Sequence, residues 1–339
     1  MIRVKLSVAL WDGGTSLEEY IGSENNIFNG VKFYVNSPKD IEYDFWFVVD
    51  DVNDRRESAL VDPARIYYFT AETIHQPGFF DTPYSQNFLS QFFKIFSSHD
   101  IYADNAYVQL PFQAWMINAN HGFSNFKENG RDINYLLNLD RLEKTSTISV
   151  ICSDKGTTPL HRLRFKFVSE MKRIFKDKLH WYGNGISPLA CKWDGVAPYK
   201  YHLCIENKAQ TNTITEKLLD SYLGLSYPIY WGAPNVAEYF PPESFELVDI
   251  FDRKKSIQVI EKVISEDPYD DVLISVSNAR DLVLNEINPF KRMAEIARTD
   301  YFCLDKPSIQ TVQIHSIVSS SPQSVLSRIL MRWFRFFGN

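Results

Sequence analysis

Polar side chains able to bind a charged ligand are concentrated in residues 199–251, where they follow an apolar run. Five of them have a distinctive spacing, with seven residues between the second and the third: Glu206, Asn207, Thr215, Glu216 and Lys217. Thr215 is a good helix cap, and the free N–H groups at a helix start bind anions. Lys217 adds a positive charge, and the Glu216 carboxylate can accept hydrogen bonds from sugar hydroxyls. The segment could hold a sugar diphosphate; the alternative is a capped surface helix with a solvated Glu-Lys pair.

A basic segment at 161–173 offers further cations. Its two candidates for a phosphate ligand are Arg162 and Arg164, because a planar guanidinium can hold two phosphate oxygens at once. Where a diphosphate is the leaving group, negative charge grows on it in the transition state, so fixed cations lower the barrier. The alternative is a basic, solvated helix face.

Short apolar runs separated by turn residues predict two series of strands. The first series covers 2–10, 44–49, 65–70 and 107–111, and the second covers 147–152, 179–182, 199–205 and 228–231. Helical patterns lie between them, at 85–97, about 161–176 and 214–224. Alternating strands and helices favour parallel sheets. We therefore expect an α/β protein with two doubly wound domains that face each other across a cleft.

Ligands of such sheets bind beyond the carboxyl ends of the strands, where Glu72 and Glu206 both lie. We place an N-terminal domain at 1–145 and a second domain at 146–315. A Ser-rich linker and a basic amphipathic tail follow at 316–339.

The pattern in 199–251 resembles the donor-binding signature of glycosyltransferase family 10, the α-1,3/1,4-fucosyltransferases, and is most similar to that of the bacterial members. The shared features are Glu-Asn, seven further residues and Thr-Glu-Lys, followed by the blocks 228–234 and 242–245. The resemblance is strong over 147–251 and weak before it. Thr213 departs from the pattern, because bacterial members often have an aromatic residue there, so a stacking contact is not implied at this position.

The resemblance implies the GT-B fold, in which two Rossmann-like domains face a central cleft, here with a C-terminal amphipathic helix. It makes 1–145 the acceptor-binding domain and 146–315 the domain that binds the donor, GDP-fucose. The implied donor-binding residues are Arg164, Glu206, Asn207, Thr215, Glu216 and Lys217. Arg164 fits the family's Arg-x-x-aromatic pattern better than Arg162 does.

An inverting transfer needs one general base, which takes the proton of the acceptor hydroxyl. The resemblance assigns this role to Glu72, which follows the predicted strand 65–70 in a context typical of the family. Asp50 and Asp51 also follow a strand and are the second choice, although their context does not match. Lys, Arg and a helix end neutralise the diphosphate in this architecture, so no metal and no cofactor is expected.

The expected reaction is inverting, metal-independent transfer of L-fucose. The expected acceptor is O3 of GlcNAc or Glc in a cell-surface glycan such as a lipopolysaccharide O-antigen. Two alternatives stay open: a GT-B transferase for another nucleotide sugar, and a non-catalytic nucleotide-sugar binding protein. The sequence indicates neither the acceptor-binding residues, nor the choice between O3 and O4, nor the oligomeric state.

Charge and composition indicate which partners and which location to expect for the protein. The 339-residue chain has 36 basic and 42 acidic residues, and a net charge of −6 disfavours non-specific binding of nucleic acid. Four scattered cysteines and the lack of a long apolar run predict a cytoplasmic protein.

The tail 323–339 has no acidic residue, and its apolar face lies opposite three cations: Arg328, Arg332 and Arg335. This pattern predicts either binding to an anionic membrane surface or packing of the tail on the protein or a second subunit.

Overall fold

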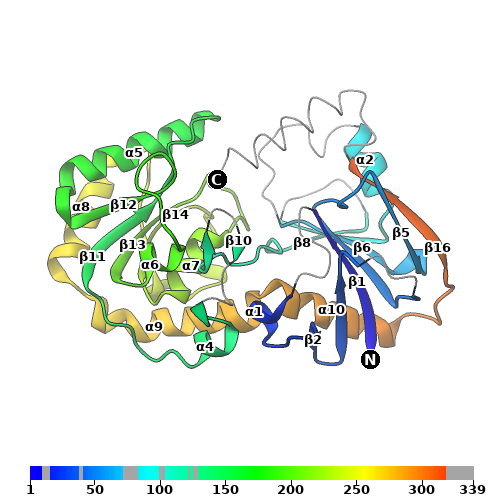
Figure 1. Ribbon diagram of the computed structural model, residues 1–339. Helices are drawn as coiled ribbons and strands as arrows, with labels where there is room; N and C mark the ends of the chain where they lie inside the picture. Colours follow the sequence, from blue (N-terminus) through cyan, green and yellow to red (C-terminus); the bar gives the residue numbers. More distant parts are fainter. Residues whose placement is uncertain are drawn as a thin grey trace. The chain divides into compact units, whose positions relative to one another are not determined.

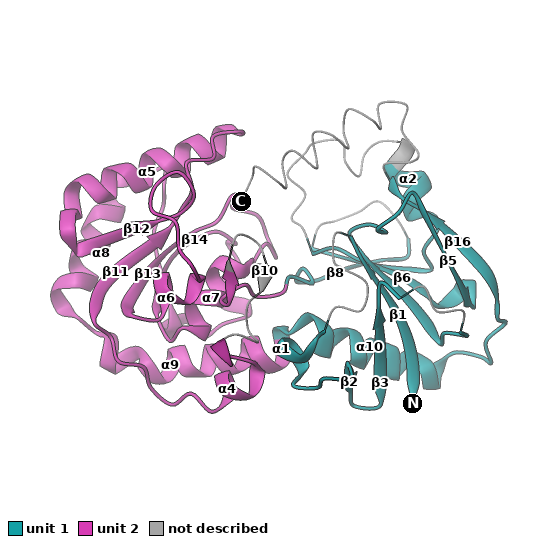
Figure 2. Ribbon diagram, viewed as in Figure 1, with its two compact units in different colours: residues 1–113, 287–337 teal, residues 114–286, 338–339 magenta. Residues whose placement is uncertain are grey.

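The computed structural model describes residues 1–9, 16–37, 41–71, 83–98, 104–120, 123–124 and 129–317. These residues form two compact units (Figure 2). One unit takes the described residues up to Gln113 and from Ile287 onward, and the other takes Ala114–Glu286. The units differ from the predicted domains, since 114–145 fold with the second unit and the described residues after 286 fold with the first.

The first unit is built on a seven-stranded sheet in the order β2-β3-β1-β4-β6-β7-β8 (Figure 1). Its strands are β1 (Ile2–Val8), β2 (Ile27–Phe28), β3 (Val31–Val35), β4 (Phe45–Val49), β6 (Ile66–Phe69), β7 (Lys94–Ser97) and β8 (Ala106–Val108). Every neighbouring pair is parallel except β2 with β3. All residues of β4 and β6 are buried, which is why both strands appear as unbroken apolar runs in the sequence.

A separate antiparallel pair in this unit joins β5 (Arg56–Val61) to β16 (Gln310–His315). The helices of the unit are α1 (Glu18–Ile21), η1 (Pro63–Arg65), α2 (Pro83–Leu89) and α10 (Pro289–Cys303). Much of the aromatic content packs in the core around the sheet. Phe69, for example, lies 4.9 Å from Phe96 and 4.5 Å from Phe112, measured between ring centroids.

Side-chain contacts hold α10 in the first unit, although it follows the second unit in sequence. The Asp300 carboxylate accepts hydrogen bonds from the Tyr67 hydroxyl at 2.6 Å and from Lys94 Nζ at 2.7 Å. The guanidinium of Arg292 lies 4.1 Å from the centre of the Phe112 ring. The boundary predicted at 315 rests on the Ser-rich stretch that follows it. No local pattern indicates that α10 contacts strands formed more than 200 residues earlier.

The helix predicted over 85–97 is wrong in its second half. Helix α2 ends at Leu89, and residues 94–97 form strand β7 between β6 and β8. The apolar residues of this segment match helical spacing, but strand pairing gives residues 94–97 hydrogen-bond partners on both sides. Pairing with distant strands is a tertiary effect, and it overrides the local periodicity.

The second unit contains a five-stranded parallel sheet in the order β12-β11-β13-β14-β15. Its strands are β11 (Ser146–Ile151), β12 (Leu179–Tyr182), β13 (Tyr199–Ile205), β14 (Tyr227–Trp231) and β15 (Glu246–Leu247), and a separate hairpin pairs β9 (Ala119–Asn120) with β10 (Phe123–Ser124). The α-helices are α4 (Ile133–Leu137), α5 (Pro159–Phe175), α6 (Lys192–Val196), α7 (Glu216–Leu223), α8 (Arg253–Glu266) and α9 (Tyr269–Leu282). Shorter turns are η2 (Lys176–Lys178), η3 (Val236–Glu238), η4 (Pro242–Ser244) and η5 (Val283–Ile287). The four strands predicted for this half are confirmed.

Two sequence predictions concern residues outside the described ranges. They are the base, Glu72, and the tail with Arg328, Arg332 and Arg335. Among the residues that the structure describes, none of the helices is both long enough and apolar enough to span a bilayer.

Candidate functional site

The polar residues singled out in the second unit lie where strand β13 ends and helix α7 begins. Strand β13 is almost entirely buried, and it carries Glu206 to a position where only 1% of that residue is exposed. The chain then returns to α7, whose N-cap is Thr215. The Thr215 hydroxyl accepts a hydrogen bond from the backbone N–H of Lys217 at 3.5 Å, as expected for a capping threonine.

Four of the predicted residues form one hydrogen-bonded cluster at this point. The carboxylate of Glu206 accepts hydrogen bonds from the backbone N–H of Thr215 at 3.0 Å and from its hydroxyl at 2.7 Å. The Lys217 ammonium lies 3.4 Å from Glu206 Oε2 and donates to Glu216 Oε1 at 3.0 Å. A single ammonium therefore lies between two carboxylates at the start of α7.

Burial and charge determine the protonation states in the cluster. Burial raises the pKa of Glu206. Burial also acts to raise the pKa of Glu216, but the charges of Lys217 and Lys192 outweigh it and lower this pKa to about 2. Burial acts to lower the pKa of Lys217, whereas the two neighbouring carboxylates raise it above the usual lysine value. Glu216 and Lys217 are therefore both ionised at neutral pH.

Helix α5 brings the predicted arginine to the same site. Arg164 is 6% exposed, and its Nη1 donates a hydrogen bond to Asn207 Oδ1. Its Nε is buried without an acceptor among the described residues. The other candidate, Arg162, is exposed and donates to the carbonyl oxygen of Gly156 at 2.8 Å. Among the described residues, Arg164 and not Arg162 presents a buried donor that lacks a partner.

Sequence reasoning missed two charged residues beside the cluster. Asp220 lies one helical turn after Glu216 on α7 and is 3% exposed. Lys192, from α6, lies 3.4 Å from Asp220 Oδ2 and 4.0 Å from Glu216 Oε1. The i, i+4 spacing of the two carboxylates could have indicated Asp220. No local pattern could have indicated Lys192, because its proximity depends on the packing of α6 against α7.

Gly232 lies against Glu206 and Tyr230; it falls in the sequence block 228–234 but was assigned no role of its own there. A Cβ atom at this position would collide with the Tyr230 hydroxyl and would lie 2.6 Å from Glu206 Cγ. The Tyr230 hydroxyl is fixed in turn, because it accepts a hydrogen bond from the backbone N–H of Ala233 at 2.8 Å. The absence of a side chain at 232 therefore allows Glu206 and Tyr230 to occupy their observed positions.

Gly232→Ala is expected to lower the free energy of unfolding by about 1–3 kcal/mol, because overpacking forces buried groups to move. Urea denaturation measures this change. Gly156→Ala is the matched control, since its Cβ would meet Arg162 Cγ at an ordinary 3.6 Å. Equal stability of the two variants would contradict the argument.

The acidic turn 50–54 serves the structure of the first unit. Asp50 Oδ1 accepts a hydrogen bond from the backbone N–H of Ala71 at 2.9 Å. Asp51 accepts from the Ser316 hydroxyl at 2.7 Å and from the backbone N–H of Ile317 at 3.2 Å. In the described part of the chain, His, Cys, Asp and Glu do not gather in groups of three or more that could hold a metal ion.

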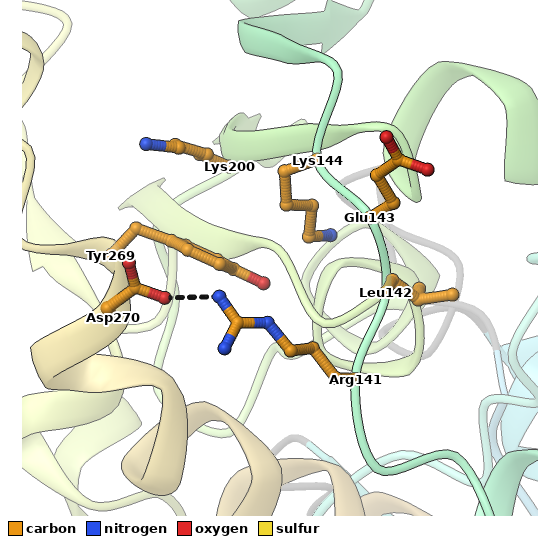
Figure 3. A pocket seen from close by; sticks show the side chains of 7 residues that line it. All are labelled: Arg141, Leu142, Glu143, Lys144, Lys200, Tyr269 and Asp270. Carbon is orange, nitrogen blue, oxygen red and sulfur yellow. Dashed lines mark hydrogen bonds and ion pairs between the residues drawn. The ribbon is translucent and has the colours of Figure 1, made fainter.

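A surface pocket of about 480 Å³ lies at the opposite end of the second unit's strands (Figure 3). Its lining includes Lys144, just before β11, and Lys200, near the start of β13. Burial lowers the pKa of Lys144 to about 7. Its ammonium nevertheless donates to the carbonyl oxygens of Ala197 at 2.8 Å and Gly224 at 2.7 Å. These contacts make Lys144 a structural residue, and the pocket is separate from the cluster at Glu206.

Two doubly wound units of this kind define a GT-B glycosyltransferase fold. The fold is similar to that of an α1,3-fucosyltransferase crystallised with GDP, with a TM-score of 0.53 and 19% identity over 90% of this chain and 92% of that one. The crystal structure with GDP-fucose gives a TM-score of 0.50 and 20% identity over 89% and 91%. The predicted fold class is confirmed.

The sequence comparisons find similarity to known proteins in the second unit. Residues 142–269 match the model of the glycosyltransferase family 10 (fucosyltransferase) C-terminal region. It is 40% identical to the α-(1,3)-fucosyltransferase FucT of Helicobacter pylori over 68 residues, which are 20% of this chain and 14% of that protein. It is 37% identical to an α-(1,4)-fucosyltransferase of Arabidopsis thaliana over 73 residues, which are 22% of this chain and 18% of that protein. The matched stretches thus span less than a fifth of either relative.

Proposed function

We propose that this protein transfers L-fucose from GDP-fucose to a hydroxyl group of a glycan. The observation that carries the proposal is the buried Nε of Arg164, which has no acceptor among the described residues. A buried N–H group without a partner costs about 1–3 kcal/mol, and a diphosphate oxygen would provide the missing acceptor. Further support comes from the fucosyltransferases among the relatives and from the crystal structures of a similar fold with GDP and GDP-fucose.

In this proposal, the cations and the carboxylates of the site bind different parts of the donor. Arg164 and Lys217 contact the diphosphate, where their charges oppose the charge that develops on departing GDP. Glu206, Asn207 and Glu216 hold the ribose and fucose hydroxyls, and Thr215 fixes Glu206 through the two hydrogen bonds described above. Since the geometry leaves Arg162 exposed, it favours Arg164 as the phosphate ligand.

The chemical step needs a base on the acceptor side. We assign it to Glu72, which is three residues beyond the last residue of β6 in the sequence. Glu72 takes the proton of the acceptor hydroxyl, while the oxygen of that hydroxyl forms a bond to C1 of fucose. The bond between C1 and the diphosphate oxygen breaks, and GDP leaves with the electron pair, so the configuration at C1 inverts. No metal ion has a role in this proposal.

The proposed acceptor is O3 of a GlcNAc or Glc unit in a cell-surface glycan such as a lipopolysaccharide O-antigen. The α-(1,3) linkage in the name of the Helicobacter pylori relative supports O3 as the first choice. Contact of the basic tail with an anionic membrane stays a prediction from the sequence.

The test combines binding and turnover. We expect GDP-fucose to raise the melting temperature more than GDP-mannose or a UDP-sugar does. We also expect GDP release with N-acetyllactosamine as acceptor, at the same rate with and without EDTA.

Other results would change the proposal. If only another nucleotide sugar raises the melting temperature, that nucleotide sugar replaces GDP-fucose as the proposed donor. Binding of GDP-fucose without transfer to any of a panel of acceptors would favour a non-catalytic binding protein. Loss of activity in EDTA would overturn metal independence.

A further inference from the structure

Lys192 lies beside the cluster, and the proposed donor contacts give it no role. Its side chain is 25% exposed and extends from α6 toward two carboxylates on α7, at 3.4 Å from Asp220 Oδ2 and 4.0 Å from Glu216 Oε1. Glu216 and Asp220 are four residues apart, so they occupy the same face of α7. Lys192 therefore bridges successive turns of the helix whose first turn carries Glu216 and Lys217.

The second carboxylate is itself anchored. Asp220 Oδ1 accepts a hydrogen bond from the backbone N–H of Met116 at 2.8 Å, while Oδ2 faces Lys192. Met116 lies just after residue 114, at which the chain enters the second unit. Asp220 is thus fixed from two sides, and it holds the Lys192 ammonium at a defined place beside Glu216.

We propose that Lys192 is a positioning residue, which keeps the Glu216 carboxylate oriented toward the donor hydroxyls. The inference rests on the proposed function, because it assumes that Glu216 binds the donor. Lys217 alone cannot fulfil this task, since its ammonium is shared among Glu206, Glu216 and the Thr215 hydroxyl. When a diphosphate binds, it competes for Lys217, whereas Lys192 stays with Glu216 and Asp220.

Lys192→Met removes the ammonium and keeps an unbranched apolar side chain of similar length. Because Glu216 contacts the donor in both the ground state and the transition state, its disorientation acts on donor affinity. We expect the KM for GDP-fucose to rise about 10–50-fold, as for loss of a hydrogen bond to a charged group, with kcat unchanged within about threefold. Lys192→Arg restores a cation, and we expect its KM to lie within about threefold of that of the wild type.

Lys200→Met is the matched control, since Lys200 forms an ion pair with Asp267 near the start of β13, at the other end of the sheet. We expect it to leave the KM for GDP-fucose unchanged. If Lys192→Met is folded and its KM equals that of the wild type, or if Lys192→Arg fails to restore KM, the inference is overturned while the proposed function stands. If the wild type neither binds nor turns over GDP-fucose, the proposed function is overturned, and this inference with it.

Discussion

Arg164→Met is expected to lower kcat for fucose transfer by about 10²–10³-fold, the usual effect of removing one fixed donor from a developing negative charge. The variant also leaves Asn207 Oδ1 without the donor that Arg164 provides, so the melting temperature falls as well. Steady-state kinetics at saturating GDP-fucose, together with a melting curve, separate the two effects. If kcat is measured at a temperature where the variant is folded, its decrease measures the lost stabilisation of the transition state.

Arg162→Met is the control, because Arg162 lies two residues away on the same helix and is exposed. Arg162 Nη1 donates a hydrogen bond to the carbonyl oxygen of Gly156, and we expect the loss of this bond to change kcat by less than about twofold. Arg164→Lys retains the charge without the planar fork, so we expect an intermediate kcat. If Arg164→Met and Arg162→Met have the same kcat, Arg164 does not contact the diphosphate.

Glu72→Gln is expected to lower kcat by about 10²–10⁴-fold, the contribution typical of a general base. The amide cannot take the proton of the acceptor hydroxyl, but the change leaves the donor residues of the second unit untouched. GDP-fucose should therefore still raise the melting temperature of the variant. Kinetics at saturating donor and acceptor, with a thermal shift for each variant, measure both quantities.

Asp51→Asn tests the competing assignment of the base. The Asp51 carboxylate accepts hydrogen bonds from Ser316 and Ile317, so we expect this variant to lose stability and to keep its kcat. A large loss of kcat in folded Asp51→Asn, with Glu72→Gln fully active, would transfer the role of base to the acidic turn. An active Glu72→Gln beside an active Asp51→Asn would refute both assignments.

Much of the second unit could be predicted from its sequence, because buried parallel strands appear as short apolar runs between turns. Glu206 and Lys217 could be predicted as site residues for the same reason. Glu206 directly follows a buried strand, and Lys217 lies in the first turn of the next helix. The strand after α2 could not be predicted from the sequence. Strand β7 forms by pairing with β6 and β8, and its own residues do not specify this pairing.

The spacing from Glu206 to Lys217, the family resemblance and the parallel α/β architecture were determined by the sequence alone, because each depends on neighbours in the chain. The tertiary structure decided which residues complete the site. It buried Arg164 and left Arg162 exposed, although both lie on one helix. It also brought Lys192 to Glu216 and returned α10 to the first unit. These outcomes depend on the packing of elements that are distant in sequence, and local composition and periodicity carry no information about such contacts.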